Sequence, residues 1–138
     1  MRVYVAGLYS RNEKGQPANL KEVFDNIQTG TRFCAELMNM GYDVYCPWLD
    51  YQVLWYIPKM PLEAFYRNSM AWLEVSEVIC VISGEGLCGG VDDEIERAKE
   101  LNIPIVRGMG ELLKQFPLQR IPQEPQVFGP DGRGEQEA

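Results

Sequence analysis

A carboxylate follows a run of glycines in the segment ISGEGLCGGVDDEIERA, which spans residues 82–98. Glu94 lies four residues after the last of these glycines. Carboxylates are among the side chains that act as nucleophiles in enzymes, so Glu94 is a candidate for covalent chemistry. Acidic residues near the start of a helix also stabilise the helix dipole, and spacing alone favours that simpler interpretation. Both interpretations require a helix to begin just after the glycines.

The sequence contains no histidine, which removes Ser-His-Asp and Cys-His catalysis and imidazole metal ligands together. The four cysteines stand at 34, 46, 80 and 88 without a C-x-x-C pair, so they predict reduced thiols rather than a zinc site. Cys88 has no histidine to activate it as a nucleophile. Carboxylates, tyrosines, lysines and backbone dipoles remain for chemistry. We expect no metal and no cofactor.

The formal net charge of -7 disfavours nucleic acid and anionic membranes as partners, since both require clustered Lys and Arg. A small-molecule ligand fits this charge better. No apolar segment approaches the roughly 18 residues of a membrane span, and the N-terminus MRVYVAGLYS leads directly into a strand pattern without a signal-peptide layout. We therefore expect no membrane association and a cytoplasmic protein.

The hydrophobic pattern alternates between strand-like and helix-like segments. Strands are predicted within residues 2–7, 41–47, 77–83 and 103–106, and helices over 20–40, 61–75, 91–101 and 110–116. This alternation predicts an α/β fold, with a flavodoxin- or Rossmann-like parallel sheet of four to five strands and helices on both faces. Along the helix over 20–40, apolar residues recur every three or four positions, including Phe24, Ile27, Leu37 and Met38.

The chain divides into one domain, residues 1–116, and a tail rich in Pro, Gly and charge, residues 117–138. Ligands of open parallel sheets bind at the carboxyl ends of the strands, where segments 7–11, 47–56 and 83–94 are expected to converge. Residues 48–61 are predicted to form a loop or short helical turns over a pocket. The aromatic residues at 48, 51, 55 and 56 fit a core, an oligomer contact or a wall that stacks on a base.

Three segments resemble the nucleoside 2-deoxyribosyltransferase superfamily: VYVAG, GYDVYCP and SEVICVISGEGLCGGVDDEIERAKELNIPIV. The likeness is greatest to small bacterial and phage-type members of unassigned function and to deoxynucleotide N-hydrolases. It covers roughly residues 2–107. Its most specific part is a small polar residue, any residue, Gly, an apolar residue, two further residues, Glu, and later Ala. This sequence has Cys88, Gly90, Val91, Glu94 and Ala98 at the defined positions.

The resemblance implies that Glu94 attacks C1′ of a deoxyribose, expels the base and forms a covalent glycosyl-enzyme. Tyr4 falls where members of the family place a tyrosine that holds this glutamate. The resemblance and the strand ends together give these candidate substrate-binding residues: Gly7, Leu8, Tyr9, Arg11, Trp48, Ser69, Cys88, Gly89 and Gly90. Family members complete each pocket with a neighbouring subunit, so a homodimer or a higher homo-oligomer is expected.

Three positions depart from the family pattern, and one of them is Glu77, which replaces the usual aspartate that opens the third strand. Cys88 stands where the family has Ser or Asp, and Ser69, beside Asn68, stands where the family has an aspartate that assists departure of the base. The expected function is therefore binding of a (deoxy)nucleoside or nucleotide, with cleavage or exchange of its N-glycosidic bond through Glu94. The alternative is a non-enzymatic nucleotide-binding protein with a degenerate site. A glycine-rich lysine-decarboxylase-like phosphoribohydrolase is disfavoured, because the P-G-G-x-G-T loop is absent.

Overall fold

The computed structural model describes residues 1–118. Four strands form one parallel sheet in the order β2-β1-β3-β4. Their bounds are β1, Arg2–Ala6; β2, Asp43–Tyr45; β3, Val78–Val81; and β4, Ile105–Arg107. Three of the predicted strand segments contain β1, β2 and β3, and the fourth, 103–106, overlaps β4, which starts and ends later. The predicted α/β fold with a flavodoxin- or Rossmann-like parallel sheet is confirmed.

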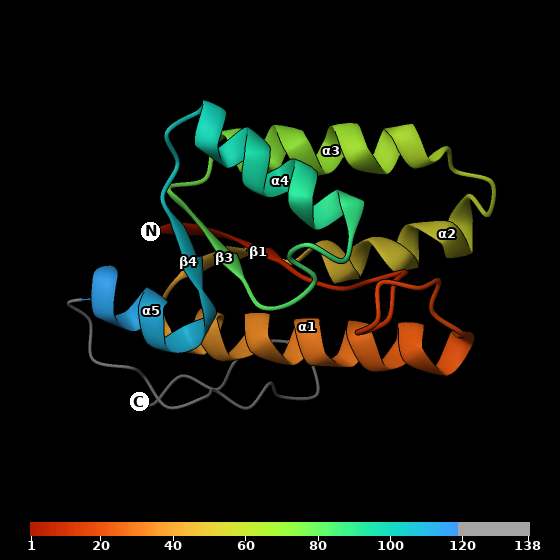
Figure 1. Cartoon of the computed structure of the whole chain (residues 1–138), viewed down its shortest axis with the longest axis horizontal. Helices are drawn as coiled ribbons and strands as arrows, with labels where there is room; N and C mark the ends of the chain where they lie inside the picture. The colour runs from red at the N-terminus through yellow and green to blue at the C-terminus, as the bar shows by residue number, and fades with distance from the viewer. Residues whose placement is uncertain (119–138) are drawn as a thin grey trace, which may run out of the picture.

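Helices cover both faces of the sheet, as Figure 1 shows, with α1 and α5 on one side and α3 and α4 on the other. Their bounds are α1, Leu20–Met40; α2, Val53–Tyr56; α3, Leu62–Glu74; α4, Gly89–Glu100; and α5, Gly108–Gln115. A 3-10 helix, η1, spans Pro47–Gln52 and runs directly into α2. The predicted short helical turns after the second strand are therefore present.

Alternation along β1 divides the core into two apolar layers. Val3 and Val5 pack into the cluster shared with α1 and α5. Tyr4 and Ala6 point to the other face, into the cluster shared with α3 and α4. Tyr4 is fully buried there, which places its hydroxyl beneath the helix that carries Glu94.

The first helix has both of its ends specified by local sequence. Asn19 accepts a hydrogen bond from the backbone of Glu22, and the Glu22 side chain accepts one from Asn19, which is a capping box. Gly41 ends the helix with a φ of 104°, a left-handed conformation that favours glycine. Phe24 and Met38 follow the apolar period but are 51% and 59% exposed. The apolar stripe is thus wider than the buried face.

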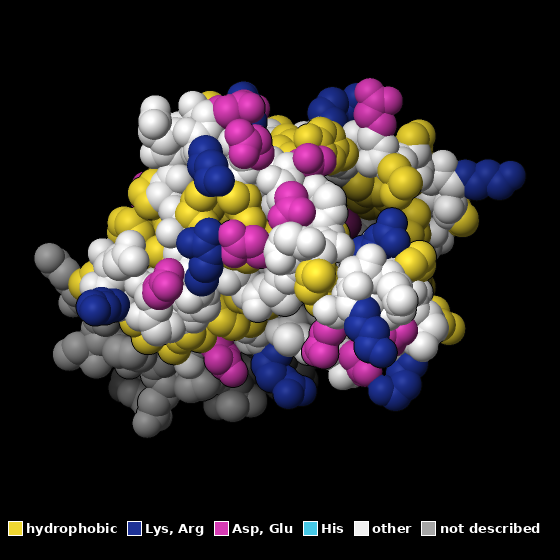
Figure 2. Space-filling model, in the orientation of Figure 1, with side chains coloured by type: hydrophobic (Ala, Val, Ile, Leu, Met, Phe, Trp, Pro, Cys, Tyr) yellow, Lys and Arg dark blue, Asp and Glu magenta, His cyan; other side chains and the backbone are white. Residues whose placement is uncertain are grey.

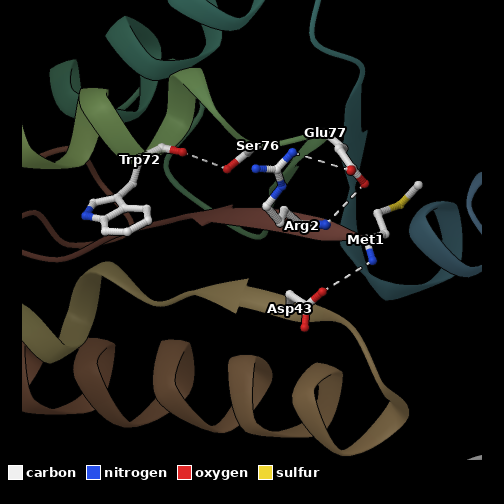
Figure 3. A network of polar contacts seen from close by, with 6 residues as sticks. All are labelled: Met1, Arg2, Asp43, Trp72, Ser76 and Glu77. Carbon is white, nitrogen blue, oxygen red and sulfur yellow. Dashed lines mark hydrogen bonds and ion pairs between the residues drawn. The ribbon is translucent and has the colours of Figure 1, made fainter.

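Polar contacts fix the strand register at the amino-terminal edge of the sheet (Figure 3). The N-terminal amine lies 3.5 Å from the carboxylate of Asp43 in β2. The Arg2 guanidinium lies 3.7 Å from Glu77, just before β3, and the Arg2 amide donates to the same carboxylate. These pairs are exposed, so each adds about 1 kcal/mol or less. They lie at the opposite edge from the strand ends where a ligand is expected.

Several predicted helix boundaries differ from the structure by one or two residues. Helix α4, for example, begins at Gly89, two residues before the predicted start. Phe116 and Leu118 still pack against the core, and the Phe116 carbonyl accepts from the Tyr42 hydroxyl at 2.7 Å. Of the predicted tail, residues 119–138 lie outside the described residues. None of the helices within residues 1–118 has the length and apolar content required to cross a membrane.

Candidate functional site

A cavity of about 300 Å³ opens at the carboxyl ends of the strands. Its lining residues come from the segment after β1, from η1 and α2, from α3, and from the first turns of α4. They are Ala6, Gly7, Tyr9, Ser10, Pro47, Trp48, Asp50, Leu54, Leu62, Phe65, Ser69, Cys88, Gly90, Val91 and Glu94. Figure 2 shows the hollow with hydrophobic walls between the ends of α2 and α3 and the start of α4. The three predicted segments therefore converge on one site.

The Tyr4 hydroxyl donates a hydrogen bond to Oε1 of Glu94 across 3.0 Å. Tyr4 comes from the middle of β1 and Glu94 from the second turn of α4, so the bond connects the sheet to the helix above it. Burial, together with the charge of Glu94, raises the pKa of Tyr4, so its hydroxyl stays protonated. This hydrogen bond engages one carboxylate oxygen of Glu94, a residue that lines the cavity.

Burial raises the pKa of Glu94 to about 7. The hydrogen bond from Tyr4 acts in the opposite direction, and the charge of Asp93 adds to the increase. A carboxyl group that titrates near neutral pH in a cavity is typical of catalytic sites, although structural networks can also produce such shifts. Glu94 is thus set apart from the exposed acidic residues around it.

The helix-dipole interpretation applies to Asp92 rather than to Glu94. Asp92 is the acidic residue in the first turn of α4, and its carboxylate accepts from the Gly86 amide at 2.8 Å. Gly86 has a φ of 76°, which a side chain would disfavour, so Asp92 holds the glycine loop in its tight turn. Glu94 lies beyond this turn. Its burial therefore requires another explanation.

Ser69 and Asn68 surround the tyrosine pair beneath the cavity. Tyr4 stacks on Tyr45 with ring centroids 5.2 Å apart. The Asn68 amide donates to the Tyr45 hydroxyl at 3.1 Å. Ser69 lies near the Tyr4 hydroxyl and partly opposes the increase in the pKa of Tyr4 that burial causes. Asn68 and Ser69 therefore lie beside the two tyrosines, and neither can donate a proton as a carboxylic acid would.

Trp48 forms a rigid wall of the cavity. Its side chain is 1% exposed, and its Nε1 donates to the Leu8 carbonyl at 2.9 Å. The indole ring lies directly against Gly30 of α1, where any side chain would overlap it. The Leu8 amide in turn donates to the Ser83 hydroxyl at 2.9 Å, which holds the segment after β1 to the end of β3.

The structure brings most of the predicted site residues together. Tyr4 lies under the cavity and is hydrogen-bonded to Glu94. The predicted residues that line the cavity are Gly7, Tyr9, Trp48, Ser69, Cys88, Gly90 and Glu94. Leu8 and Gly89 are not part of the lining, and Leu8 contributes through its backbone instead. Arg11 is exposed and bridges to Pro17, away from the cavity.

The four aromatic residues after β2 have different environments. Trp48 lines the cavity, and Tyr51 packs against the core. Trp55 and Tyr56 in α2 are 77% and 87% exposed, which excludes a core role within the chain. The core alternative thus holds for Trp48 and Tyr51, while the oligomer contact and the wall that stacks on a base stay predictions.

Several lining residues escaped the sequence prediction. Leu62 and Phe65 reach the cavity only because α3 lies over the strand ends, which no local pattern indicates, and Leu54 was covered only by the prediction that residues 48–61 lie over a pocket. Asp50 did carry a signal, since it lies in the segment directly after the second strand. In the structure Asp50 lines the same cavity as Glu94.

The fold and the site define an α/β protein with a carboxylate-containing cavity at the switch between β1 and β3. No family model matches the chain, and searches of curated proteins and of solved structures also find no match. The assignment of a function therefore depends on the chemistry of the cavity.

Replacing Tyr4 by phenylalanine is expected to raise the pKa of Glu94 further above its value of about 7. The hydroxyl stabilises the ionised carboxylate, so its removal favours the protonated form. A ¹³C NMR titration of the glutamate side chains measures this shift. Tyr42→Phe, which removes a hydroxyl on the opposite face of the sheet, should leave Glu94 unchanged. An unchanged pKa in Tyr4→Phe would contradict the role of the hydrogen bond.

Proposed function

We propose that this protein binds a (deoxy)nucleoside or nucleotide in the cavity and cleaves or exchanges its N-glycosidic bond, with Glu94 as the nucleophile. The observation that carries the proposal is the Glu94 carboxylate, withdrawn into the cavity and held at 3.0 Å by the Tyr4 hydroxyl. A carboxylate in this setting suits attack on a sugar carbon that develops positive charge. The resemblance to nucleoside 2-deoxyribosyltransferases supports the same chemistry.

The reaction takes two displacements. An oxygen of Glu94 bonds to C1′ while the bond from C1′ to the base breaks, which leaves a glycosyl-enzyme and a free base. Water or a second base then attacks C1′ and releases Glu94. Tyr4 holds the carboxylate in position, and the apolar surfaces of Trp48, Leu54 and Phe65 favour a flat base and exclude water.

The charge of the cavity favours an uncharged substrate. Its lining contains two carboxylates, Asp50 and Glu94, and within residues 1–118 it contains no Lys or Arg. A 5′-phosphate would lack a cationic side chain there, although amides at the start of α4 favour anions. We therefore propose a nucleoside ahead of a nucleotide as the preferred ligand.

A non-enzymatic binding protein is the second candidate. Its support is Ser69, which interacts with Tyr4 where a proton-donating aspartate is expected for catalysis. Such a protein would retain the cavity and the ligand but would release no base. Both candidates fit a cytoplasmic protein.

A base-release assay separates the two candidates. The protein is incubated with a panel of 2′-deoxynucleosides, their ribonucleoside counterparts and their 5′-monophosphates, with and without an acceptor base, and the products are separated by chromatography. Released or exchanged base supports the enzyme. Binding by calorimetry without release of base supports the second candidate, and the absence of both would remove the proposed function.

We also propose that a second copy of the chain covers the mouth of the cavity. Leu62, which lines the cavity, is 85% exposed, so the apolar wall is incomplete in a single copy. The adjacent exposed segment, residues 53–57 with the sequence VLWYI, carries no charge in a chain of net charge -7. Two like-charged copies would therefore meet with least repulsion at this surface.

Replacing Tyr56 by glutamate is expected to weaken self-association at least tenfold, because it places a buried charge in each copy's contact. Sedimentation velocity over a range of concentrations measures the effect. Leu113→Glu, on the exposed side of α5, is the matched control and should leave association unchanged. A wild-type protein that remains monomeric at the highest concentration tested would refute the proposed contact.

A further inference from the structure

The cavity contains a second carboxylate that the Glu94 mechanism does not use. Asp50 lies in η1, half-buried, and its side chain is part of the lining. Departure of a base from C1′ leaves charge on a ring nitrogen, and a proton donor lowers this barrier. Ser69 cannot act as that acid. Asp50 is the remaining carboxyl group in the cavity besides the nucleophile.

We propose that Asp50 is the general acid that protonates the departing base. This inference rests on the proposed function, since it assigns a further catalytic residue to the same reaction.

The sheet topology places the two carboxylates at opposite sides of the site. In the strand order β2-β1-β3, β1 lies between the strand that leads to Asp50 and the strand that leads to Glu94. A nucleoside placed over the end of β1 can therefore direct its sugar toward Glu94 and its base toward Asp50. Trp48, two residues before Asp50, is buried, and its indole donates a hydrogen bond to the Leu8 carbonyl. The backbone that carries Asp50 is therefore anchored.

The surroundings of Asp50 favour its protonated form. Burial raises the pKa of Asp50, with no hydrogen bond or opposite charge in the described chain acting against it. The titratable groups that face it are Tyr9 after β1, Tyr45 at the end of β2 and Glu94 of α4 across the cavity. Burial, with a smaller contribution from Asp50, raises the pKa of Tyr9 and Tyr45, so both are neutral, and neither stabilises an Asp50 carboxylate as a cation would.

The proton balance closes over the two steps. In the first, Glu94 bonds to C1′, the electron pair of the C1′–N bond moves to the base, and Asp50 transfers its proton to that nitrogen. In the second, water attacks C1′ and gives its proton to the Asp50 carboxylate, and the bond to Glu94 breaks. The net reaction is nucleoside plus water to free base plus deoxyribose, with both carboxyl groups restored. A second base replaces water in the transfer reaction.

This division of roles predicts the pH dependence. The reactive form has Glu94 ionised and Asp50 protonated, so the rate should rise with pH as Glu94 loses its proton and fall as Asp50 loses its own. The apparent pKa values belong to the pair, since two carboxyl groups in one cavity titrate together. Asp50→Asn should lose the alkaline decrease and retain the acidic one.

The experiment compares leaving groups that need a proton with one that does not. The probes are the deoxynucleoside that reacts fastest in the panel and p-nitrophenyl 2-deoxyriboside, whose nitrophenolate departs as an anion. Asp50→Asn is expected to lose about 10² to 10⁴-fold in kcat/KM on the nucleoside and less than tenfold on the nitrophenyl compound. Glu94→Gln should lose activity on both, and Asp43→Asn, at the other edge of the sheet, on neither.

Thermal unfolding first establishes that Asp50→Asn is folded, and Asp50→Glu should recover part of the nucleoside activity. Equal losses on both probes would assign Asp50 a structural role, and no loss on the nucleoside would exclude it as the acid. Either result overturns the inference while leaving the proposed function intact. A wild-type protein that is inert toward both probes would instead remove the proposed function, and the inference with it.

Discussion

Replacing Glu94 by glutamine is expected to lower the release of base by about 10³-fold or more. Glutamine has nearly the same shape and still accepts the hydrogen bond that Tyr4 donates at 3.0 Å. Its amide oxygen is a poor nucleophile and cannot form the glycosyl intermediate. The measurement is the rate of base release under single-turnover conditions, and trapping of the intermediate by mass spectrometry supplies a second readout. Activity equal to that of the wild type would exclude Glu94 as the nucleophile.

The same substitution is expected to stabilise the fold at alkaline pH, which shows that lost activity is not lost structure. Burial raises the pKa of Glu94 from its ordinary value of 4.5 to about 7. The folded protein therefore loses stability as pH rises from the unfolded pKa through the folded one, and has no such cost below both. Glu94→Gln should gain about 1–3 kcal/mol at pH 8 and nothing at pH 4. Urea denaturation at both values measures this. Equal stability of the two proteins at pH 8 would contradict a burial cost.

Stability opposes the proposed catalytic role at Glu94. A carboxylate that is partly withdrawn from water reduces the stability of the fold, and the Tyr4 hydrogen bond offsets only part of this cost. The nearby Asp92 shows the contrasting case, since it stays near the surface and holds the glycine loop. Two acidic residues of one short segment thus have different physical roles.

The fold follows from features that a local reading of the sequence can detect. The strands β1 and β3 are apolar runs covered on both faces, and the bounds of α1 are marked by Asn19 and Gly41. Alternation of strand and helix then implies a parallel sheet. The exposed Phe24 shows where the local pattern fails, because periodicity identifies an apolar stripe and tertiary packing decides how much of it is buried.

The site is harder to predict from the sequence than the fold, because its contacts join residues far apart in the chain. The hydrogen bond between Tyr4 and Glu94 joins residues 90 positions apart, and only the family resemblance predicted that pair. Asp50 has no motif around it, and its proposed role depends on the burial that its place in η1 gives it. Arg11 was predicted in the site from its place after the first strand, yet the chain turns away there to bridge with Pro17.

Replacing Gly30 by alanine is expected to destabilise the fold by about 3 kcal/mol and to disturb the cavity wall. A helix ordinarily gains up to about 1 kcal/mol from this change. At Gly30, however, the added methyl group would overlap the Trp48 indole ring. The ring cannot retreat without breaking its bond to the Leu8 carbonyl.

Gly110→Ala in α5 is the matched control, since its added methyl group meets no atom within 4 Å and should slightly stabilise the helix. Urea denaturation measures both variants, and the near-ultraviolet circular dichroism of the buried indole reports whether Trp48 has moved. Trp48→Leu added to Gly30→Ala should recover part of the lost stability, because the smaller side chain leaves room for the methyl group.

If Gly30→Ala proves as stable as Gly110→Ala, the close contact between α1 and Trp48 is wrong. The inference that a rigid Trp48 anchors the segment with Asp50 would then be weakened, because Gly30 is the residue of α1 that the indole ring contacts.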